Sequence, residues 1–200
     1  MKQMLLTLLR NVQTPREQFR DAAHKLSEIL AYESAQVLSK TQVSIETPLA
    51  SMRGERFEEE IVLIPILRSG LAMLPAFLRV YPNALVGLIG TVRDEATAKP
   101  SLYYSKLPPL RESQRIFLLD PMIATGGSAG AALQIILGAG ISQEKIGVIS
   151  FLAAPEGLAH LQNIAPHARV ITVATDEKLS TNKWILPGLG DFGDRYFGTV

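Results

Sequence analysis

From residue 61 onward the sequence repeats one pattern, in which short apolar runs alternate with segments of helical spacing. The runs are rich in isoleucine, valine and leucine, and they are Ile61–Ile66, Leu85–Thr91, Ile116–Leu119, Ile146–Leu152 and Val170–Ala174. Continuous apolarity indicates strands that are buried on both faces, as in a parallel sheet covered by helices. Helical spacing follows in Leu71–Val80, Ser128–Leu137 and Pro155–Ala165. This alternation predicts a right-handed α/β fold with a parallel sheet flanked by helices.

The residues before this pattern predict a helix and a small antiparallel arm. Thr14–Glu17 places a hydroxyl, a proline and a glutamate in the order expected at a helix N-terminus, with Thr14 as the cap. Apolar residues at helical spacing follow, and the helix is expected to reach about Leu38. The alternating stretch Val43–Thr47, with a turn at Arg53–Glu55, indicates a short antiparallel piece outside the main sheet.

Composition excludes several classes of protein. A chain of 200 residues with 47% hydrophobic residues fits one globular domain, residues 1–200. Because cysteine is absent, there is no disulfide scaffold, thiol nucleophile or cysteine-ligated metal site. A formal net charge of +1 gives no bulk electrostatic reason to expect nucleic acid. No apolar run is long enough to span a membrane, and the stretch before Arg10 is too short for a signal peptide, so a cytoplasmic protein is expected.

The clearest chemical signal lies between the run ending at Leu119 and the helix that begins near Ser128. Asp120 follows a buried strand, so its carboxylate is expected at the carboxyl edge of the sheet, where open α/β sheets bind ligands. Thr125–Ser128, with its two glycines, then leads into a helix N-terminus, where backbone N–H groups and hydroxyls favour an anion. The alternative is a tight turn that needs glycine only for its backbone. The acid and the flanking hydroxyls favour a phosphate site.

These residues resemble a known motif. Asp120–Ser128 is similar to the 5-phosphoribosyl-1-pyrophosphate (PRPP) motif of type I phosphoribosyltransferases, in the variant of the uracil phosphoribosyltransferases. Three further segments resemble that family in the same order, and they are Pro65–Leu71, Arg93–Glu95 and Ile185–Arg195. The resemblance covers nearly the whole chain.

The resemblance implies site residues. Those implied for PRPP are Arg68, Arg93, Asp120, Pro121, Met122, Ile123, Ala124, Thr125, Gly126, Gly127, Ser128 and Asp191. Those implied for uracil are Ile185, Gly190, Asp191 and Phe192, with Ile185, Gly190 and Phe192 acting through their backbones. Arg68, Asp120 and Asp191 are the implied catalytic residues.

Two of these assignments also have a physical basis in the residues. Arg68 and Arg93 each follow an apolar strand, so both are expected at the same sheet edge, where guanidinium groups suit a pyrophosphate. Either arginine alone is more often a surface residue or part of an ion pair. Gly188–Gly193 matches a dinucleotide-binding pattern, but the residues after it leave no room for the required helix and strand. A packed glycine-rich loop is the alternative reading of this segment.

The expected reaction transfers the phosphoribosyl group of PRPP to uracil, giving UMP and pyrophosphate. Mg²⁺ is the expected cofactor, held mainly through PRPP rather than by a protein metal site. The resemblance also implies a homodimer or homotetramer, with the arm and the first helix as contact candidates, and GTP as a possible activator. The alternatives are a regulator that senses PRPP and binds nucleic acid, and an enzyme for another base. Ser180 and Trp184 depart from the usual family residues beside the base, so they bear on base preference.

Two remaining segments carry weaker expectations. Arg93–Gln114 shows no periodic pattern and is predicted to be a long loop. Its Tyr103 and Tyr104 belong either to a lid over the site or to an anchor for the loop. The stretch Asp176–Val200 looks too irregular for a helix.

Overall fold

A computed structural model of the chain describes residues 1–93 and 100–199. Its main sheet has the strand order β10 (Arg169–Thr175), β9 (Ile146–Ala153), β7 (Gln114–Leu119), β3 (Glu60–Leu67), β5 (Leu88–Arg93) and β6 (Pro100–Lys106). Neighbouring strands are parallel from β10 to β5, and only β6 runs antiparallel. Two short strands extend the sheet, β4 (Leu85–Val86) beside β3 and β8 (Met122–Ile123) beside β9. The predicted parallel sheet is confirmed.

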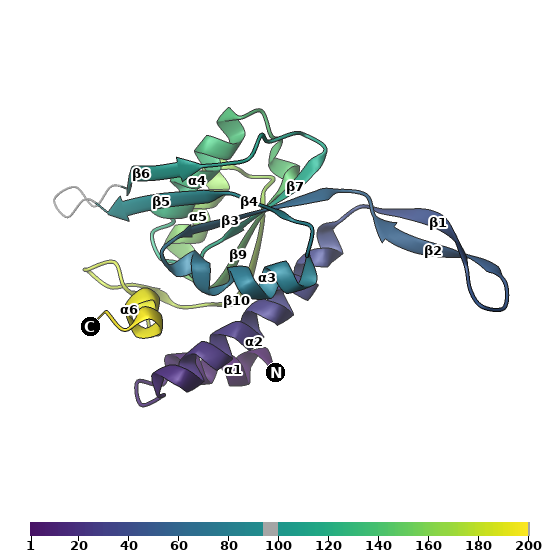
Figure 1. Cartoon of the computed structure of the whole chain (residues 1–200). Helices are drawn as coiled ribbons and strands as arrows, with labels where there is room; N and C mark the ends of the chain where they lie inside the picture. Colours follow the sequence, from purple (N-terminus) through teal and green to yellow (C-terminus); the bar gives the residue numbers. More distant parts are fainter. Residues whose placement is uncertain (94–99, 200) are drawn as a thin grey trace.

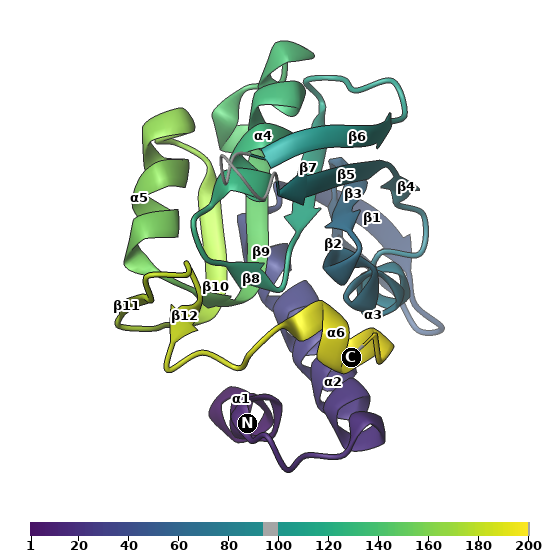
Figure 2. The same cartoon turned by 90° about the vertical axis from the view of Figure 1, so that its left-hand side faces the viewer.

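Helices cover both faces of this sheet (Figures 1 and 2). On one face lie α2 (Arg16–Ser34) and α3 (Leu74–Val80), and on the other lie α4 (Gly127–Gly138) and α5 (Pro155–Ile164). Side chains of β3 alternate between the two cores, since Leu63 packs toward α2 and α3 while Val62 and Ile64 pack toward α4 and α5. Because each strand is apolar on both faces, the sequence shows continuous apolar runs instead of alternation.

The N-terminal apolar stretch is helix α1 (Lys2–Arg10), which packs against the core through Leu5, Leu6 and Leu9. The following helix, α2, ends at Ser34 and continues as the 3₁₀ turn η1 (Ala35–Val37), close to the expected end. The predicted cap by Thr14 is wrong, because α2 has no side-chain cap hydrogen bond. Over the residues that the structure describes, no helix has the length and apolar character needed to cross a membrane.

The predicted arm is a hairpin of β1 (Lys40–Glu46) and β2 (Ser51–Phe57) that extends away from the sheet (Figure 1). Its turn is not at Arg53–Glu55, which lies inside β2, but at Thr47–Ala50. The Thr47 hydroxyl donates to the Ala50 carbonyl at 2.8 Å and accepts from the Ala50 N–H at 3.0 Å, so a threonine side chain closes the turn.

The predicted loop Arg93–Gln114 instead contains strand β6, which pairs with β5. Tyr103 packs across Gly90, where a Cβ atom would lie 2.6 Å from the tyrosine ring. A glycine on one strand therefore makes room for an aromatic side chain on its neighbour, and 57% of Tyr103 remains exposed. Of the segment predicted to be a loop, residues 94–99, which include Asp94 and Glu95, lie outside the described residues.

The C-terminal stretch was predicted to lack a helix, and this is wrong. It contains a small pair of strands, β11 (Lys178–Leu179) and β12 (Ile185–Leu186), followed by helix α6 (Phe192–Phe197). Asp191 caps α6, because its Oδ1 atom accepts a hydrogen bond from the Asp194 N–H at 2.9 Å. A capped helix of 6 residues is too short to show apolar periodicity in sequence.

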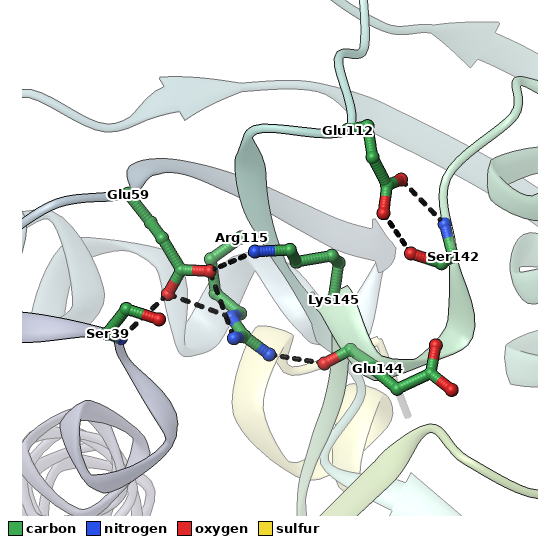
Figure 3. Close-up of polar contacts among 7 residues, drawn as sticks. All are labelled: Ser39, Glu59, Glu112, Arg115, Ser142, Glu144 and Lys145. Atoms are coloured by element: carbon green, nitrogen blue, oxygen red, sulfur yellow. Dashed lines mark hydrogen bonds and ion pairs between the residues drawn. The ribbon is translucent and has the colours of Figure 1, made fainter.

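A buried polar network ties strands together at the amino end of the sheet (Figure 3). The side chain of Glu59 accepts from Lys145 at 2.7 Å and pairs with Arg115 at 3.0 Å, and the Ser39 N–H donates to it at 3.0 Å. Burial alone would raise the pKa of Glu59, but these hydrogen bonds and the charge of Arg115 lower it overall. This end of the sheet is therefore closed by charged groups.

Candidate active site

The opposite, carboxyl end of the sheet opens into a cavity of about 440 Å³. Its walls come from the ends of β3, β5 and β7, the start of α4 and the C-terminal segment, and the lining residues are Ile66, Leu67, Ser69, Thr91, Asp120, Met122, Ala124, Ser128, Asn182, Lys183, Trp184, Ile185, Gly190, Asp191 and Phe192. A second cavity of about 170 Å³ is lined by Asp120, Met122, Ala124, Thr125, Gly126, Gly127, Ser128, Ala129 and Lys183. The two share Asp120, Met122, Ala124, Ser128 and Lys183, so they adjoin.

The segment predicted to be a phosphate cradle lines the smaller cavity. Gly126 has a φ of +75°, and a Cβ atom there would lie 2.7 Å from the Gly157 carbonyl oxygen of α5. Only glycine meets both the backbone and the packing requirement at this position. The first turn of α4 then presents its N–H groups to the cavity, with the hydroxyls of Thr125 and Ser128 beside them.

The predicted PRPP segment divides into lining and supporting residues. Asp120, Met122, Ala124 and Thr125–Ser128 line one or both cavities, whereas Pro121 and Ile123 line neither. Ile123 is buried in the core, and the Pro121 carbonyl accepts from the Phe151 N–H at 3.0 Å. These two residues attach the cradle to β9 and the core.

Asp120 is the buried carboxylate of the site, with 9% of its surface exposed. It follows β7, as predicted, and its Oδ1 accepts from the Met122 N–H at 3.3 Å. Burial raises the pKa of Asp120 to about 7, and this one hydrogen bond opposes the shift only in part. Among the described residues Asp120 forms no ion pair, so the carboxylate is available to groups that enter the cavity.

The two arginines predicted to bind pyrophosphate are placed differently. Arg68 follows β3, and its neighbours Leu67 and Ser69 line the larger cavity. Its side chain turns toward α6, 3.4 Å from Asp194 and 5.7 Å from the centre of the Phe197 ring. Arg93 ends β5 at the same edge of the sheet, but its side chain lies outside what the structure describes.

The residues predicted to read the base lie together on the other side of the larger cavity. Ile185, Gly190, Asp191 and Phe192 all line it. Gly190 has a φ of +80°, so the chain turns sharply there between β12 and α6. Ile185 and Phe192 are buried apolar residues, so the polar groups of these four residues are the Asp191 carboxylate and the backbone.

Two long-range arginine contacts hold this C-terminal segment, and the sequence analysis missed both. Arg10, at the end of α1, donates to Asp176 Oδ2 and to the Gly188 carbonyl, each at 2.8 Å. The Gly188 N–H in turn donates to Asp176 at 2.7 Å. Arg195 donates to the carbonyls of Leu9 and Leu189. We call this set of contacts the arginine clamp.

The short loop between β11 and β12 adds residues that sequence reasoning also missed, Asn182 and Lys183. Trp184, expected beside the base, does line the larger cavity. Ser180 does not line it but holds Trp184, since its N–H donates to the Trp184 carbonyl at 2.7 Å and its Oγ accepts from the Trp184 N–H at 3.0 Å. The Ser-Thr-Asn-Lys sequence signals a turn, but nothing in it shows that the turn faces the cavity.

Thr91 is a further polar residue of the larger cavity. The Oγ1 of Thr91 is a buried hydroxyl without a hydrogen-bond partner in the described structure, and the residue lines the larger cavity. The residues lining the two cavities include no histidine. Across residues 1–93 and 100–199, no group of three His, Asp or Glu side chains is placed to hold a metal ion.

Comparison with known proteins points to the family that the sequence motifs resemble. Residues 1–199 match the family model described as uracil phosphoribosyltransferase. The chain is 43% identical over 194 residues to the uracil phosphoribosyltransferase of Malacoplasma penetrans, covering 97% of this chain and 93% of that protein. It is 41% identical over 195 residues to the one from Thermus thermophilus, with the same shares covered.

Solved structures agree on the fold. The AQ2163 protein from Aquifex aeolicus superposes with a TM-score of 0.90 at 34% identity, covering 99% of this chain and 94% of that one. Adenine phosphoribosyltransferase from Giardia lamblia has a TM-score of 0.52 at 14% identity, covering 78% and 81%, and shows the fold alone. With the full-length family match and these relatives, the chain belongs to the uracil phosphoribosyltransferase family.

Proposed function

We propose that the chain transfers the 5-phosphoribosyl group from PRPP to uracil, releasing pyrophosphate and forming UMP. One observation carries the proposal. A phosphate cradle at the start of α4 and a glycine-turned segment, Ile185–Phe192, face a single cavity. A sugar phosphate in the cradle and a small base against that segment would meet above the buried carboxylate of Asp120.

The cradle side of the site binds the phosphorylated sugar in this proposal. Backbone N–H groups of Gly126 and Gly127, with the hydroxyls of Thr125 and Ser128, donate to a phosphate. Asp120 accepts hydrogen bonds from the ribose hydroxyls. Its burial strengthens such bonds, because the local dielectric constant is low.

The pyrophosphate side relies on Arg68 and Arg93. Guanidinium groups bind phosphate oxygens in a bidentate manner. The pair between Arg68 and Asp194 is exposed and 3.4 Å long, so it opposes a turn of Arg68 toward substrate only weakly. Asp191 holds the start of α6 and lines the same cavity.

The base side needs few side chains, because uracil presents a compact pattern of donors and acceptors that main-chain groups can read. We assign this to the backbones of Ile185, Gly190 and Phe192, with the Trp184 side chain as a neighbouring wall. In the reaction, a uracil nitrogen attacks the ribose C1 atom while pyrophosphate leaves. Positioning and electrostatic stabilisation of the leaving charge lower the barrier.

Mg²⁺ fits this site as a partner of the substrate. Carboxylate oxygens suit Mg²⁺, which usually keeps several waters and binds through substrate phosphates. Asp120 is the side chain placed to meet it, and the ion would supply neutralisation of charge on the leaving group. The protein residues bind and orient the sugar phosphate around it.

The direct test incubates purified protein with PRPP, Mg²⁺ and labelled uracil. We expect UMP and pyrophosphate in equal amounts, and none when PRPP is omitted. No UMP from folded protein at millimolar substrate would contradict the proposal. Competition by other bases decides the base preference, since a purine that replaces uracil would favour the alternative enzyme. Submicromolar, salt-dependent nucleic-acid binding would favour the regulator.

We also propose that the arm makes subunit contacts in a homodimer or homotetramer. Ile45, Met52 and Phe57 are exposed apolar residues on β1 and β2, which extend from the body of the molecule (Figure 1). Light scattering of the protein and of an arm-deleted variant tests this, because only the first should exceed the monomer mass. GTP is tested as an activator by adding it to the uracil assay.

A further inference from the structure

The described lining of the two cavities carries more negative than positive charge. It includes the carboxylates of Asp120 and Asp191, while the proposed substrate brings several negative charges. Arg68 is turned to Asp194 and lines neither cavity. Of the described residues that line the two cavities, Lys183 is the one basic residue.

Lys183 borders both cavities from an element remote in sequence from the cradle. It lies between β11 and β12, whereas the other residues of the smaller cavity all belong to the segment Asp120–Ala129. The smaller cavity therefore has one wall from residues of the segment Asp120–Ala129 and a second from Lys183 of the hairpin β11–β12. A phosphate bound in this cavity would lie between the two walls.

The backbone at Lys183 is held in an uncommon conformation. Its φ is +65°, a region that non-glycine residues seldom occupy. The loop keeps it there through hydrogen bonds, because the Lys183 N–H donates to the Ser180 carbonyl at 2.9 Å and Ser180 bonds twice to Trp184. Such conformations persist where the surroundings enforce them, and they concentrate at binding sites.

The Lys183 side chain is not committed elsewhere in the described structure. It forms no ion pair with any residue in 1–93 or 100–199. The nearby Glu156 already accepts a hydrogen bond from the Leu179 N–H at 3.0 Å. An ammonium group that lines a phosphate cradle without a protein partner is suited to a phosphate.

We propose that Lys183 is a substrate-binding residue that contacts the phosphate monoester held by the cradle and selects phosphorylated over unphosphorylated ribose. This rests on the proposed function, because PRPP supplies the phosphate. The assignment is to the monoester rather than to pyrophosphate, since Lys183 lines the cavity formed by Thr125–Ser128. It adds a positive charge to the smaller cavity, whose other lining residues carry none.

The test compares Lys183→Gln with Lys183→Arg in steady-state kinetics. We expect Lys183→Gln to raise the KM for PRPP by about 10- to 100-fold, the range of a hydrogen bond to a charged group, and to leave the KM for uracil within about twofold. Lys183→Arg keeps the charge and should recover most of the loss. Lys178→Gln removes an exposed lysine of the same hairpin that lines neither cavity, and it should match the unsubstituted protein.

Competitive inhibitors then identify the phosphate. For Lys183→Gln we expect the inhibition constant of ribose 5-phosphate against PRPP to rise in parallel with the KM, and that of pyrophosphate to stay the same. Equal weakening of both inhibitors, or of pyrophosphate alone, would overturn the assignment to the monoester. An unchanged KM for PRPP in an active Lys183→Gln variant would overturn the proposal entirely.

Failure of the proposed function gives a different result. The unsubstituted protein would then form no UMP, and ribose 5-phosphate binding would be measured directly by calorimetry. Loss of that binding in Lys183→Gln, with an unchanged melting temperature, would still support the phosphate contact. Equal binding by both proteins would contradict it.

Discussion

The two halves of the site are held in contrasting ways. The cradle is a continuous segment, Asp120–Ser128, attached to the sheet by strand β8 and to α5 by the close approach of Gly126 to Gly157. The base-side segment, Ile185–Phe192, is fixed by the arginine clamp, in which Arg10 contacts residues 166 and 178 positions away and Arg195 contacts Leu9, 186 positions away. The cradle thus depends on local backbone geometry, while the base side depends on a helix at the other end of the chain.

The largest effect is expected where the cradle backbone itself is broken. Gly126→Ala places a Cβ atom 2.7 Å from the Gly157 carbonyl oxygen in a left-handed conformation, so the loop must shift. We expect a loss of about 1–3 kcal/mol in stability and a fall in kcat/KM for PRPP of at least about 100-fold. Assays with varied PRPP and a thermal melt measure both.

Gly138→Ala is the matched control at the other end of α4. Its Cβ atom would meet nothing within 4 Å, and the residue is helical. We expect unchanged kinetics and equal or slightly higher stability. If the two variants behave alike, the cradle does not depend on the backbone of Gly126.

Loss of the arginine clamp should weaken uracil binding more than PRPP binding. Arg10→Gln removes the hydrogen bonds to Asp176 and Gly188 and leaves a carboxylate that is 6% exposed without its charged partner. We expect the KM for uracil to rise about tenfold and the KM for PRPP to change by less than about threefold. Measuring both constants separates the two halves of the site.

Lys2→Gln serves as the control for the clamp, because it removes a more exposed ion pair, with Glu33, from the same helix. It should leave both constants unchanged. An equal rise in both KM values for Arg10→Gln would indicate a general loss of structure, and the contrast between the two halves would fail.

A smaller effect is expected from pH at the cradle. The pKa of Asp120 is raised to about 7, so in the free protein its carboxyl group gains a proton as the pH falls through about 7. A neutral carboxyl group accepts ribose hydroxyls less well, and we expect kcat/KM for PRPP to fall by up to about tenfold per pH unit below that value. A pH profile tests this, and Asp120→Asn should remove the step. An identical step in Asp120→Asn would assign it to another group.

The smallest effect is expected from Asp194→Asn. This change removes the exposed pair with Arg68 and keeps the shape of the side chain. Because exposed pairs contribute about 0–1 kcal/mol, the KM for PRPP should fall by no more than about threefold. A large rise would mean that Asp194 holds Arg68 in its binding position instead of competing with substrate.

The contrast between local and long-range contacts also explains which features the sequence could predict. The apolar runs and the Asp120–Ser128 segment are local patterns, and they formed the expected elements, except that the run Leu85–Thr91 is divided into β4 and β5. The turn at Thr47 and the cap at Asp191 depend on single side-chain hydrogen bonds, which change no periodicity. Strand β6 was missed because residues 101–106 are all exposed, so the strand forms no apolar run. The clamp was missed because nothing near Arg10 in sequence indicates Asp176 as its partner.

Glu59 and Asp120 lie at opposite ends of the sheet, and their contributions to the stability of the fold change with pH in opposite directions. Glu59 has a lowered pKa, so its contribution to stability is present above its unfolded value of 4.5 and is lost as the pH falls through the folded value. Asp120 has a raised pKa, so its contribution is complete below its unfolded value of 3.8 and is lost as the pH rises through about 7.

The Asp120 contribution begins to be lost above pH 3.8, whereas the Glu59 contribution is complete above pH 4.5, so the two groups together favour greatest stability at about pH 4. The proposed role of Asp120 in binding ribose hydroxyls needs its ionised form, so we expect the best activity at higher pH. These two groups therefore favour stability under acidic conditions in which Asp120, a residue of the proposed active site, is protonated.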